Sequence, residues 1–248
     1  MARRIRQHTH GEKLVPGGRE ITFDFREAEL PPIPAILQLP ASAKPVPAVV
    51  LLHGLTSSKE VLAGSIGKEL LRRGIGGIAI DLPLHGARGA GLEGAVLRDP
   101  LQVVARWSQA QAEARLALRY LTARPEVDRA RLALLGYSLG AQLALAVAAE
   151  EREVRAVVLA AGGDLPEGTA LDTFARRLAD PIAAIRRLAG KPLLMVHGRS
   201  DRTVTPAQAE RLFAAAGEPK EIRWYDAGHR LPTVAAVDVA NWLTDRLR

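Results

Sequence analysis

The 248-residue sequence contains no cysteine, few aromatic residues and no long apolar run. The absence of cysteine excludes disulfide bonds, thiolate metal sites and a cysteine nucleophile. No stretch reaches the roughly 18 consecutive apolar residues that a membrane-spanning helix needs. The basic N-terminus also lacks the apolar core of a signal peptide. The sequence therefore predicts a cytoplasmic protein that makes no membrane contact.

Metal ions and nucleic acids are also poor candidates as partners. The six histidines show none of the spacings typical of metal ligands, so we expect no metal and no cofactor. The formal net charge is +7, but the basic residues are scattered in pairs such as Arg72-Arg73 and Arg176-Arg177 on amphipathic helices. Nucleic-acid surfaces usually interleave a basic stripe with aromatic residues, and no such stripe occurs. The pairs are therefore expected to form solvated helix faces.

Short apolar runs alternate with longer helical patterns from about residue 47 onward, which is typical of a parallel sheet connected by helices. Before them, residues 21–25 alternate with period two, and Pro31-Pro32 separates them from the apolar run 33–39. This pattern predicts an antiparallel N-terminal hairpin. The fold class is therefore α/β: a mostly parallel eight-stranded sheet, flanking helices, at most a small cap, and a single domain over residues 1–248. Strands are predicted at 21–25, 33–39, 47–53, 76–81, 132–137, 154–161, 192–197 and 221–225. Helices are predicted at 59–73, 101–122, 138–150, 206–217 and 232–248, and a helical stretch with breaks at 170–188.

Residues 136–140, Gly-Tyr-Ser-Leu-Gly, join a predicted apolar strand to a predicted apolar helix. A serine at the tip of a sharp strand-to-helix turn needs small residues two positions to either side, because a Cβ there would clash with the neighbouring backbone. Gly136 and Gly140 meet this need. The pattern predicts that Ser138 is a nucleophile, and the alternative is an ordinary helix cap.

A serine nucleophile needs a base to take its proton and an acid to orient that base. His229 lies just past the last predicted strand, and Asp201 lies just past the strand before it. We therefore predict His229 as the base and Asp201 as the acid. Asp226, three residues before the histidine, and Asp164, at the end of an earlier strand, are alternative acids.

From about residue 47 to the end, the chain resembles bacterial α/β-hydrolases, in particular dienelactone-hydrolase-like and peptidase-related esterases. The resemblance rests on His53-Gly54 after an early strand, the Gly-Tyr-Ser-Leu-Gly turn, His-Gly-Arg-Ser-Asp at 197–201 and a late Gly-His, with the chain order Ser138, Asp201, His229. It implies the α/β-hydrolase fold and a carboxylesterase-type serine hydrolase. Dienelactone hydrolases proper are characterised by a cysteine nucleophile, so Ser138 does not carry their particular reaction with it.

Ester hydrolysis also needs two backbone N–H donors aimed at the oxygen of the tetrahedral intermediate. Leu139 is one candidate because it follows the nucleophile at a helix N-terminus, and the resemblance implies Leu55 as the other. His53 and His197 each precede a glycine at a strand end and are expected to shape the loops by hydrogen bonds. His85, in Asp-Leu-Pro-Leu-His-Gly, is expected to anchor its own loop.

Specificity in this fold comes from the segments that cover the strand ends, here residues 82–107 and 163–189. Trp107 and Phe174 in these segments are candidate substrate-binding residues. We expect an open apolar cleft that takes small-molecule esters of short to medium acyl chain, in a monomer or homodimer. Acyl thioester hydrolysis, a small peptidase with the same triad, and a catalytically silent ligand-binding protein remain alternatives.

Overall fold

The computed structural model describes residues 5–27, 30–89, 100–166, 176–188 and 190–248. Within them a nine-stranded sheet has the strand order β1-β2-β3-β5-β4-β6-β7-β8-β9. The strands are β1 Ile5–Val15, β2 Gly18–Glu27, β3 Ile33–Pro40, β4 Val46–Leu52, β5 Gly76–Ile80, β6 Val127–Tyr137, β7 Val154–Ala160, β8 Leu193–Gly198 and β9 Lys220–Tyr225. The helices are α1 Lys59–Leu62, the π-helix η1 Ala63–Gly67, α2 Lys68–Arg72, the 3-10 helix η2 Gly86–Arg88, α4 Pro100–Thr122, α5 Leu139–Ala148, α7 Pro181–Arg186, α8 Pro206–Ala215 and α9 Thr233–Arg246.

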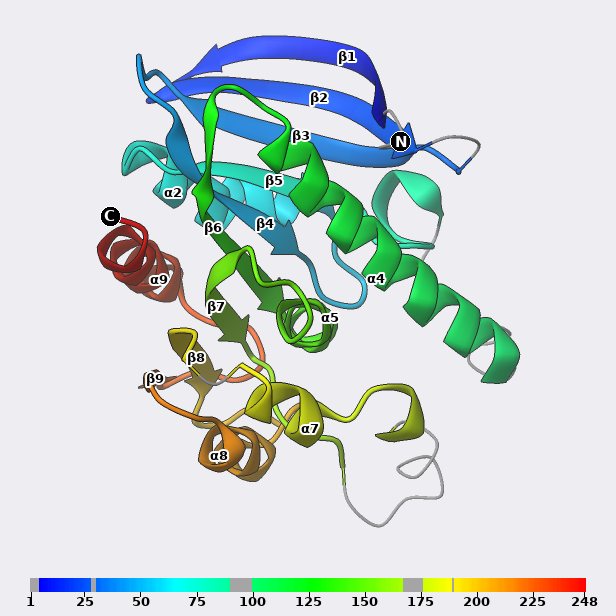
Figure 1. Cartoon of the computed structure of the whole chain (residues 1–248). Helices are drawn as coiled ribbons and strands as arrows, with labels where there is room; N and C mark the ends of the chain where they lie inside the picture. Colours follow the sequence, from blue (N-terminus) through cyan, green and yellow to red (C-terminus); the bar gives the residue numbers. More distant parts are fainter. Residues whose placement is uncertain (1–4, 28–29, 90–99, 167–175, 189) are drawn as a thin grey trace.

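The sheet is antiparallel at its N-terminal edge and parallel elsewhere. Strands β1, β2, β3 and β5 pair antiparallel, and every pair from β5 through β4 to β9 is parallel. Figure 1 shows β1 and β9 at opposite edges of the sheet. Because parallel strands end at the same edge, the turns after β4, β5, β6, β7, β8 and β9 gather there.

Helices cover both faces of the sheet, which explains why its central strands are continuously apolar. In β4, the side chains of Ala48, Val50 and Leu52 join the core that includes α4 and α5. Val49 and Leu51 point the other way, into a second core that includes residues of α1, η1, α2 and α9. This alternation follows from the two-residue period of a strand. Figure 1 shows α4 and α9 on opposite sides of the sheet.

The predicted fold class is confirmed, but the sheet has one strand more than the eight predicted. The additional strand is β1, which pairs antiparallel with β2 from Ile5↔Glu27 to Val15↔Gly18. Its side chains are almost all exposed, so no alternating apolar pattern marks it in the sequence. Backbone hydrogen bonds to β2 hold it instead. The predicted hairpin is thus part of a three-stranded antiparallel unit.

One helical prediction needs correction, and another agrees with the described residues. The helix predicted at 59–73 is divided into α1, η1 and α2, and Ser58 at its N-cap makes no side-chain capping hydrogen bond. The helical stretch with breaks predicted at 170–188 agrees with the described part of the chain, where residues 176–178 are helical and α7 follows at Pro181–Arg186, with Asp180 accepting from two first-turn N–H groups. Residues 167–175 of that stretch lie outside the described residues. None of the helices in the described ranges is long and apolar enough to cross a membrane.

Candidate active site

Ser138 lies at the turn between β6 and α5, in a backbone conformation that side-chain-bearing residues rarely adopt. Its φ is 53° and its ψ is −111°. Such strained positions are frequent at functional sites. A Cβ on Gly136 would lie 1.9 Å from the carbonyl oxygen of Gly140, and a Cβ on Gly140 would lie 2.0 Å from the carbonyl oxygen of Leu52. The strand and the helix therefore approach so closely that only glycine fits at both positions.

The structure brings Ser138, His229 and Asp201 into one chain of hydrogen bonds. The Nε2 atom of His229 lies 3.0 Å from the Oγ atom of Ser138, and its Nδ1 atom lies 2.8 Å from the Oδ2 atom of Asp201. An ionised carboxylate can only accept, so the histidine proton is assigned to Nδ1. The Nε2 lone pair then faces the serine hydroxyl. This arrangement can remove the serine proton.

Asp201 is held in place by the turn that follows β8. Its side chain is buried, and its Oδ1 atom accepts hydrogen bonds from the backbone N–H groups of Thr203 and Val204 at 2.8 and 3.0 Å. One carboxylate oxygen therefore accepts hydrogen bonds from the turn, and the other accepts one from His229. Because a buried polar group is stable only when it is paired or hydrogen-bonded, these contacts explain how the Asp201 side chain can be buried.

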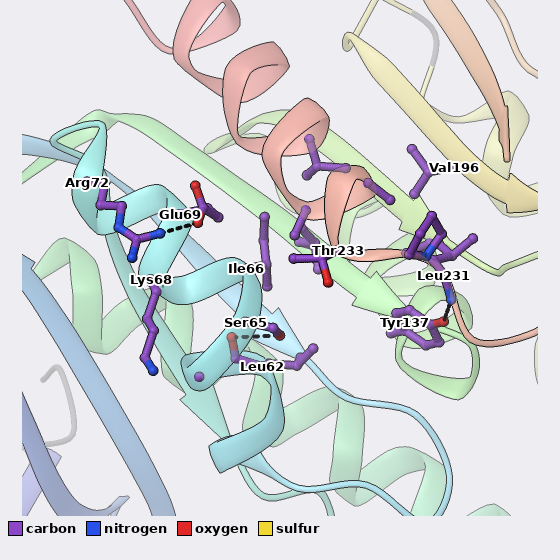
Figure 2. A pocket seen from close by; sticks show the side chains of 17 residues that line it. Leu62, Ser65, Ile66, Lys68, Glu69, Arg72, Tyr137, Val196, Leu231 and Thr233 are labelled. Atoms are coloured by element: carbon purple, nitrogen blue, oxygen red, sulfur yellow. Dashed lines mark hydrogen bonds and ion pairs between the residues drawn. The ribbon is translucent and has the colours of Figure 1, made fainter. Parts of the chain in front are cut away.

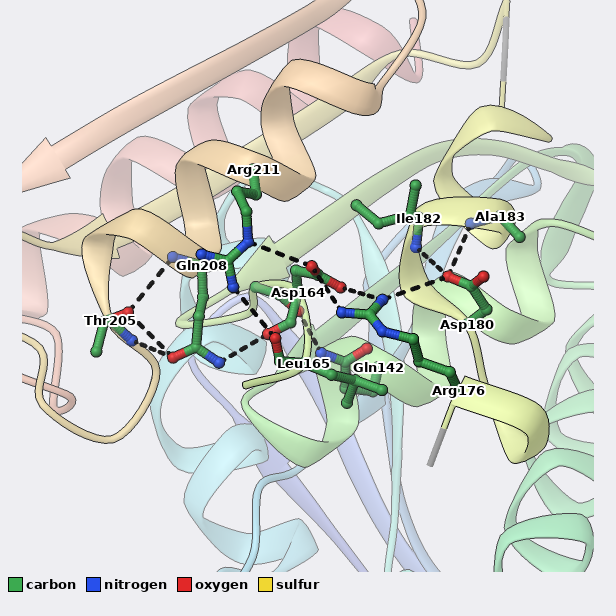
Figure 3. Close-up of polar contacts among 11 residues, drawn as sticks. Gln142, Asp164, Leu165, Arg176, Asp180, Ile182, Ala183, Thr205, Gln208 and Arg211 are labelled. Atoms are coloured by element: carbon green, nitrogen blue, oxygen red, sulfur yellow. Dashed lines mark hydrogen bonds and ion pairs between the residues drawn. The ribbon is translucent and has the colours of Figure 1, made fainter. Parts of the chain in front are cut away.

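The two alternative acids lie elsewhere. The Asp226 side chain is 96% exposed, and its ion pair is with Arg199. Asp164 is buried, and its two carboxylate oxygens accept from the guanidinium of Arg176 at 3.0 and 3.1 Å (Figure 3). Burial alone would raise the pKa of Asp164, but the hydrogen bonds from Arg176 and from the N–H of Leu165 lower it below its usual value. Neither carboxylate contacts His229 within the described part of the chain.

The segment after β7 is fastened by the same polar network around Asp164. Gln208 on α8 donates to the carbonyl oxygen of Asp164 at 2.8 Å, and Gln142 on α5 donates to the carbonyl oxygen of Gly163 at 2.5 Å. Arg211, also on α8, donates to the carbonyl oxygen of Leu165 (Figure 3). Two helices therefore hold the backbone beside the turn that carries Ser138.

His53 and His197 make loop-shaping hydrogen bonds of the kind that the sequence predicts. The Nδ1 atom of His53 donates to the carbonyl oxygen of Gly54 at 2.8 Å, and its Nε2 atom accepts from the N–H of Leu82 at 3.1 Å. His197 donates through Nε2 to the carbonyl oxygen of Val204, in the turn that carries Asp201. Burial lowers the pKa of both histidines. This favours the neutral ring that His53 needs in order to accept from Leu82.

The loop after β5 depends more on Asp81 than on His85. His85 donates through Nδ1 to the carbonyl oxygen of Pro83 at 2.8 Å. The buried Asp81 carboxylate accepts from the backbone N–H and the Nζ of Lys59 at 2.9 and 2.7 Å, and from the N–H of Ala87 at 2.9 Å. Asp81 therefore ties this loop to the start of α1, a role that sequence reasoning missed.

The two predicted oxyanion donors lie in the backbone next to Ser138. Leu139 is the first residue of α5, and N–H groups in the first turn of a helix have no partner within the helix. Leu55 follows Gly54, where a Cβ would lie 3.3 Å from the Cβ atom of Ser138. The turn that contains Leu55 therefore packs against Ser138.

Tyr137 holds the loop of His229, and sequence reasoning missed it. Its hydroxyl donates to the carbonyl oxygen of His229 at 2.5 Å and accepts from the N–H of Leu231 at 3.0 Å. Burial raises the pKa of Tyr137, which keeps the donor protonated. Figure 2 shows Tyr137 and Leu231 beside a cavity of about 390 Å³ between η1 and α9. The sequence shows an aromatic residue directly before Ser138. It does not show which loop this residue contacts, because His229 is 92 positions away.

Of the two predicted substrate-binding residues, the structure describes one. Trp107 on α4 lines a second cavity, of about 200 Å³, together with Leu139. Phe174 lies outside the described residues, as do residues 90–99 and 167–175 of the two predicted covering segments. In the ranges that the structure describes, no group of three or more histidine, aspartate or glutamate side chains could hold a metal ion.

The fold and the strained serine turn after β6 define the chain as an α/β-hydrolase. Acetyl xylan esterase 1 from Thermoanaerobacterium sp. shares this fold: its TM-score is 0.80 at 19% identity, over 100% of this chain and 89% of that one. Residues 33–232 match the dienelactone hydrolase family. The chain belongs to the dienelactone hydrolase family.

Similar sequences occur in bacteria. Esterase YjfP from Escherichia coli is 27% identical over 217 residues, which cover 79% of this chain and 86% of that protein. An uncharacterized protein from Mycobacterium tuberculosis is 36% identical over 115 residues. That match covers 44% of this chain and 41% of the relative's own length.

Proposed function

We propose that this chain is a serine hydrolase that cleaves carboxylic esters of short to medium acyl chain through an acyl-enzyme. Ser138 is the nucleophile, His229 the general base and acid, and Asp201 the residue that orients the imidazole. The observation that carries the proposal is the unbroken hydrogen-bond chain from Ser138 through His229 to Asp201. Membership in the dienelactone hydrolase family and the similarity to Esterase YjfP support ester hydrolysis in general.

In the first half-reaction, the Oγ atom of Ser138 attacks the ester carbonyl carbon while Nε2 of His229 takes its proton. The carbonyl oxygen becomes an oxyanion, which the N–H groups of Leu139 and Leu55 stabilise. The intermediate then collapses, the bond from carbon to the alcohol oxygen breaks, and the imidazolium returns the proton to the leaving alcohol. The acyl group remains on Ser138.

The second half-reaction releases the acid. A water molecule attacks the acyl carbon and gives its proton to Nε2 of His229. The bond from carbon to Oγ breaks, and the imidazolium protonates Ser138 again. The products are a carboxylic acid and a free enzyme, so the cycle is balanced without a cofactor.

The test is intact-mass spectrometry after incubation with a fluorophosphonate, followed by turnover of p-nitrophenyl esters of increasing acyl length. We expect one adduct in the wild type, none in Ser138→Ala, and one in the control Ser42→Ala, which removes an exposed serine hydroxyl. We expect the turnover to be highest with short to medium acyl chains. Folded wild-type protein that forms no adduct, or Ser138→Ala that retains turnover, would contradict the proposal and favour a ligand-binding role.

A further inference from the structure

The turn that carries Leu55 has a conformation that its own residues do not favour. The N–H of Ser57 donates to the carbonyl oxygen of Gly54 at 3.2 Å, which closes a four-residue turn. Thr56, the third residue of this turn, has a φ of 60°. Glycine or asparagine normally occupies such a position, because other side chains are strained there. Contacts with other parts of the chain must therefore hold the turn.

Residues directly after β5 contact this turn on both sides. Before the turn, the Nε2 atom of His53 accepts from the N–H of Leu82 at 3.1 Å. After the turn, the N–H of Lys59 donates to Oδ1 of Asp81 at 2.9 Å, and its Nζ donates to Oδ2 at 2.7 Å. The side chains of His53, Lys59 and Asp81 are buried. Two consecutive residues, Asp81 and Leu82, therefore fasten both ends of the segment that contains Leu55.

The direction of the Leu55 N–H group is fixed through the carbonyl group of the preceding residue. The Nδ1 atom of His53 donates to the carbonyl oxygen of Gly54 at 2.8 Å, so this oxygen accepts from His53 as well as from Ser57. A peptide unit is planar and trans, so its N–H points away from its C=O. Within the described residues, the N–H of Leu55 donates no hydrogen bond. This donor is therefore held in one direction and is available to a substrate oxygen.

We propose that His53 and Asp81 are positioning residues for the oxyanion donor at Leu55. Neither residue touches the substrate. His53 orients the peptide unit that carries the Leu55 N–H, and Asp81 holds the start of α1 directly after the turn. This inference rests on the proposed ester hydrolysis at Ser138. Because the oxyanion exists only in the tetrahedral intermediate and its transition states, the two residues stabilise these species and not the bound ester.

The test separates the two nitrogens of His53. The side-chain amide of asparagine reaches the place of Nδ1, and that of glutamine reaches the place of Nε2. His53→Asn can therefore still donate to Gly54, whereas His53→Gln can accept from Leu82 but cannot donate to Gly54. Turnover of a p-nitrophenyl ester gives kcat and KM. Inhibition by butylboronic acid gives Ki for a tetrahedral adduct on Ser138, which places an oxygen where the oxyanion forms.

We expect His53→Gln to lower kcat and raise Ki at least about tenfold, because misorientation costs part of the 10²–10³-fold in kcat that loss of one oxyanion donor costs. KM should stay within about twofold of the wild type, since the ground state is unaffected. His53→Asn should keep kcat and Ki within about threefold. Neither KM nor Ki depends on the fraction of protein that is folded, so partial unfolding does not imitate this result.

Asp81→Asn tests the other end of the turn. The carboxylate accepts from the N–H and Nζ of Lys59 and from the N–H of Ala87, so an amide nitrogen faces a donor whichever way the new side chain is turned. We expect kcat to fall and Ki to rise, with KM unchanged. His85→Gln is the matched control: His85 is also buried and its Nδ1 also donates to a carbonyl oxygen, but to that of Pro83. It should leave kcat, KM and Ki unchanged.

The positioning role and the proposed function fail in different ways. Equal values of kcat and Ki in His53→Asn and His53→Gln would refute the role of His53 and leave ester hydrolysis at Ser138 intact. A lower kcat in His53→Gln with an unchanged Ki would also refute it, since a merely structural defect has that effect. Wild-type kcat and Ki in Asp81→Asn would refute the role of Asp81. Wild-type protein that hydrolyses no ester and forms no fluorophosphonate adduct would refute the proposed function itself.

Discussion

Replacement of Asp201 by asparagine tests the hydrogen-bond chain at its buried end. Asparagine has nearly the same size, and its carbonyl oxygen can still accept from the N–H groups of Thr203 and Val204, so the turn after β8 keeps its shape. The atom that faces Nδ1 of His229 then becomes an amide nitrogen, which donates. Nδ1 must accept from it, and the ring proton moves to Nε2. Nε2 can then no longer take the proton of Ser138.

The expected loss is large because the substitution inverts the histidine tautomer. The same exchange in the serine protease triad lowers kcat by about 10⁴-fold. At 1.36 kcal/mol for each factor of ten, this is about 5.4 kcal/mol of transition-state stabilisation. We expect kcat of Asp201→Asn to fall by about 10³–10⁴-fold. The protein should stay folded, since the two backbone hydrogen bonds persist.

The assay is turnover of a p-nitrophenyl ester, with thermal unfolding as the check on folding. Asp226→Asn and Asp164→Asn are the matched controls, because these carboxylates are the alternatives to Asp201 that the sequence offers. Both should keep kcat within about threefold of the wild type, which corresponds to less than about 0.7 kcal/mol. A kcat of Asp201→Asn within tenfold of the wild type, or an equal loss in Asp226→Asn, would refute the reasoning.

Three further predictions concern the surroundings of the site. Tyr137→Phe removes the hydroxyl that bridges the loop of His229, and we expect kcat to fall about tenfold, consistent with the loss of about 1.4 kcal/mol; an unchanged kcat would show that the loop is held by other contacts. Gly140→Ala places a Cβ 2.0 Å from the Leu52 carbonyl oxygen and should cost about 3 kcal/mol in the free energy of unfolding, and an unaltered urea midpoint would contradict this. The lowered pKa of Asp164 stabilises the fold above the ordinary aspartate value and ceases to do so as the pH falls through the native value. Asp164→Asn should therefore be less stable than the wild type at pH 7 by about 1–3 kcal/mol in the free energy of unfolding, and equally stable in strong acid. Urea unfolding that shows the same difference at both pH values would argue against the ion pair.

The elements that short-range patterns encode were predicted well. The helix expected at 206–217 begins at Pro206 and is capped by Thr205, whose side chain and that of Gln208 form a capping box. The strands β4, β5 and β7 match their apolar runs to within one residue at each end. Continuous apolar runs predict such strands because both faces of a parallel sheet are buried.

The elements that the sequence did not predict lack a local signal. Strand β1 is exposed along nearly its whole length, so only its pairing with β2 makes it a strand. The π-helix η1 occurs inside an ordinary helical pattern, and its extra residue per turn leaves no mark in the apolar spacing. In both cases backbone hydrogen bonds, which every residue type can make, determine the structure.

The aspartate that pairs with His229 also lacks a decisive local signal in the sequence. Asp164, Asp201 and Asp226 all lie near strand ends, and the sequence favours Asp201 only by its position after the strand that precedes His229's strand and by resemblance. The structure separates them by their contacts, since Asp201 is paired with His229, Asp164 with Arg176, and Asp226 with an exposed arginine. These contacts join residues that are up to 28 positions apart in the sequence.

The sequence by itself therefore determined the α/β class, the sharp turn around Ser138 and the chain order of Ser138, Asp201 and His229. These depend on the apolar period of each segment and on two glycines, which act over a few residues. The tertiary structure alone decided which carboxylate faces His229, that Tyr137 holds the histidine loop, and that residues directly after β5 hold the turn that carries Leu55. The reason is physical: hydrogen bonds and cavities depend on distances of a few ångströms between segments far apart in the chain, and only the folded chain sets those distances.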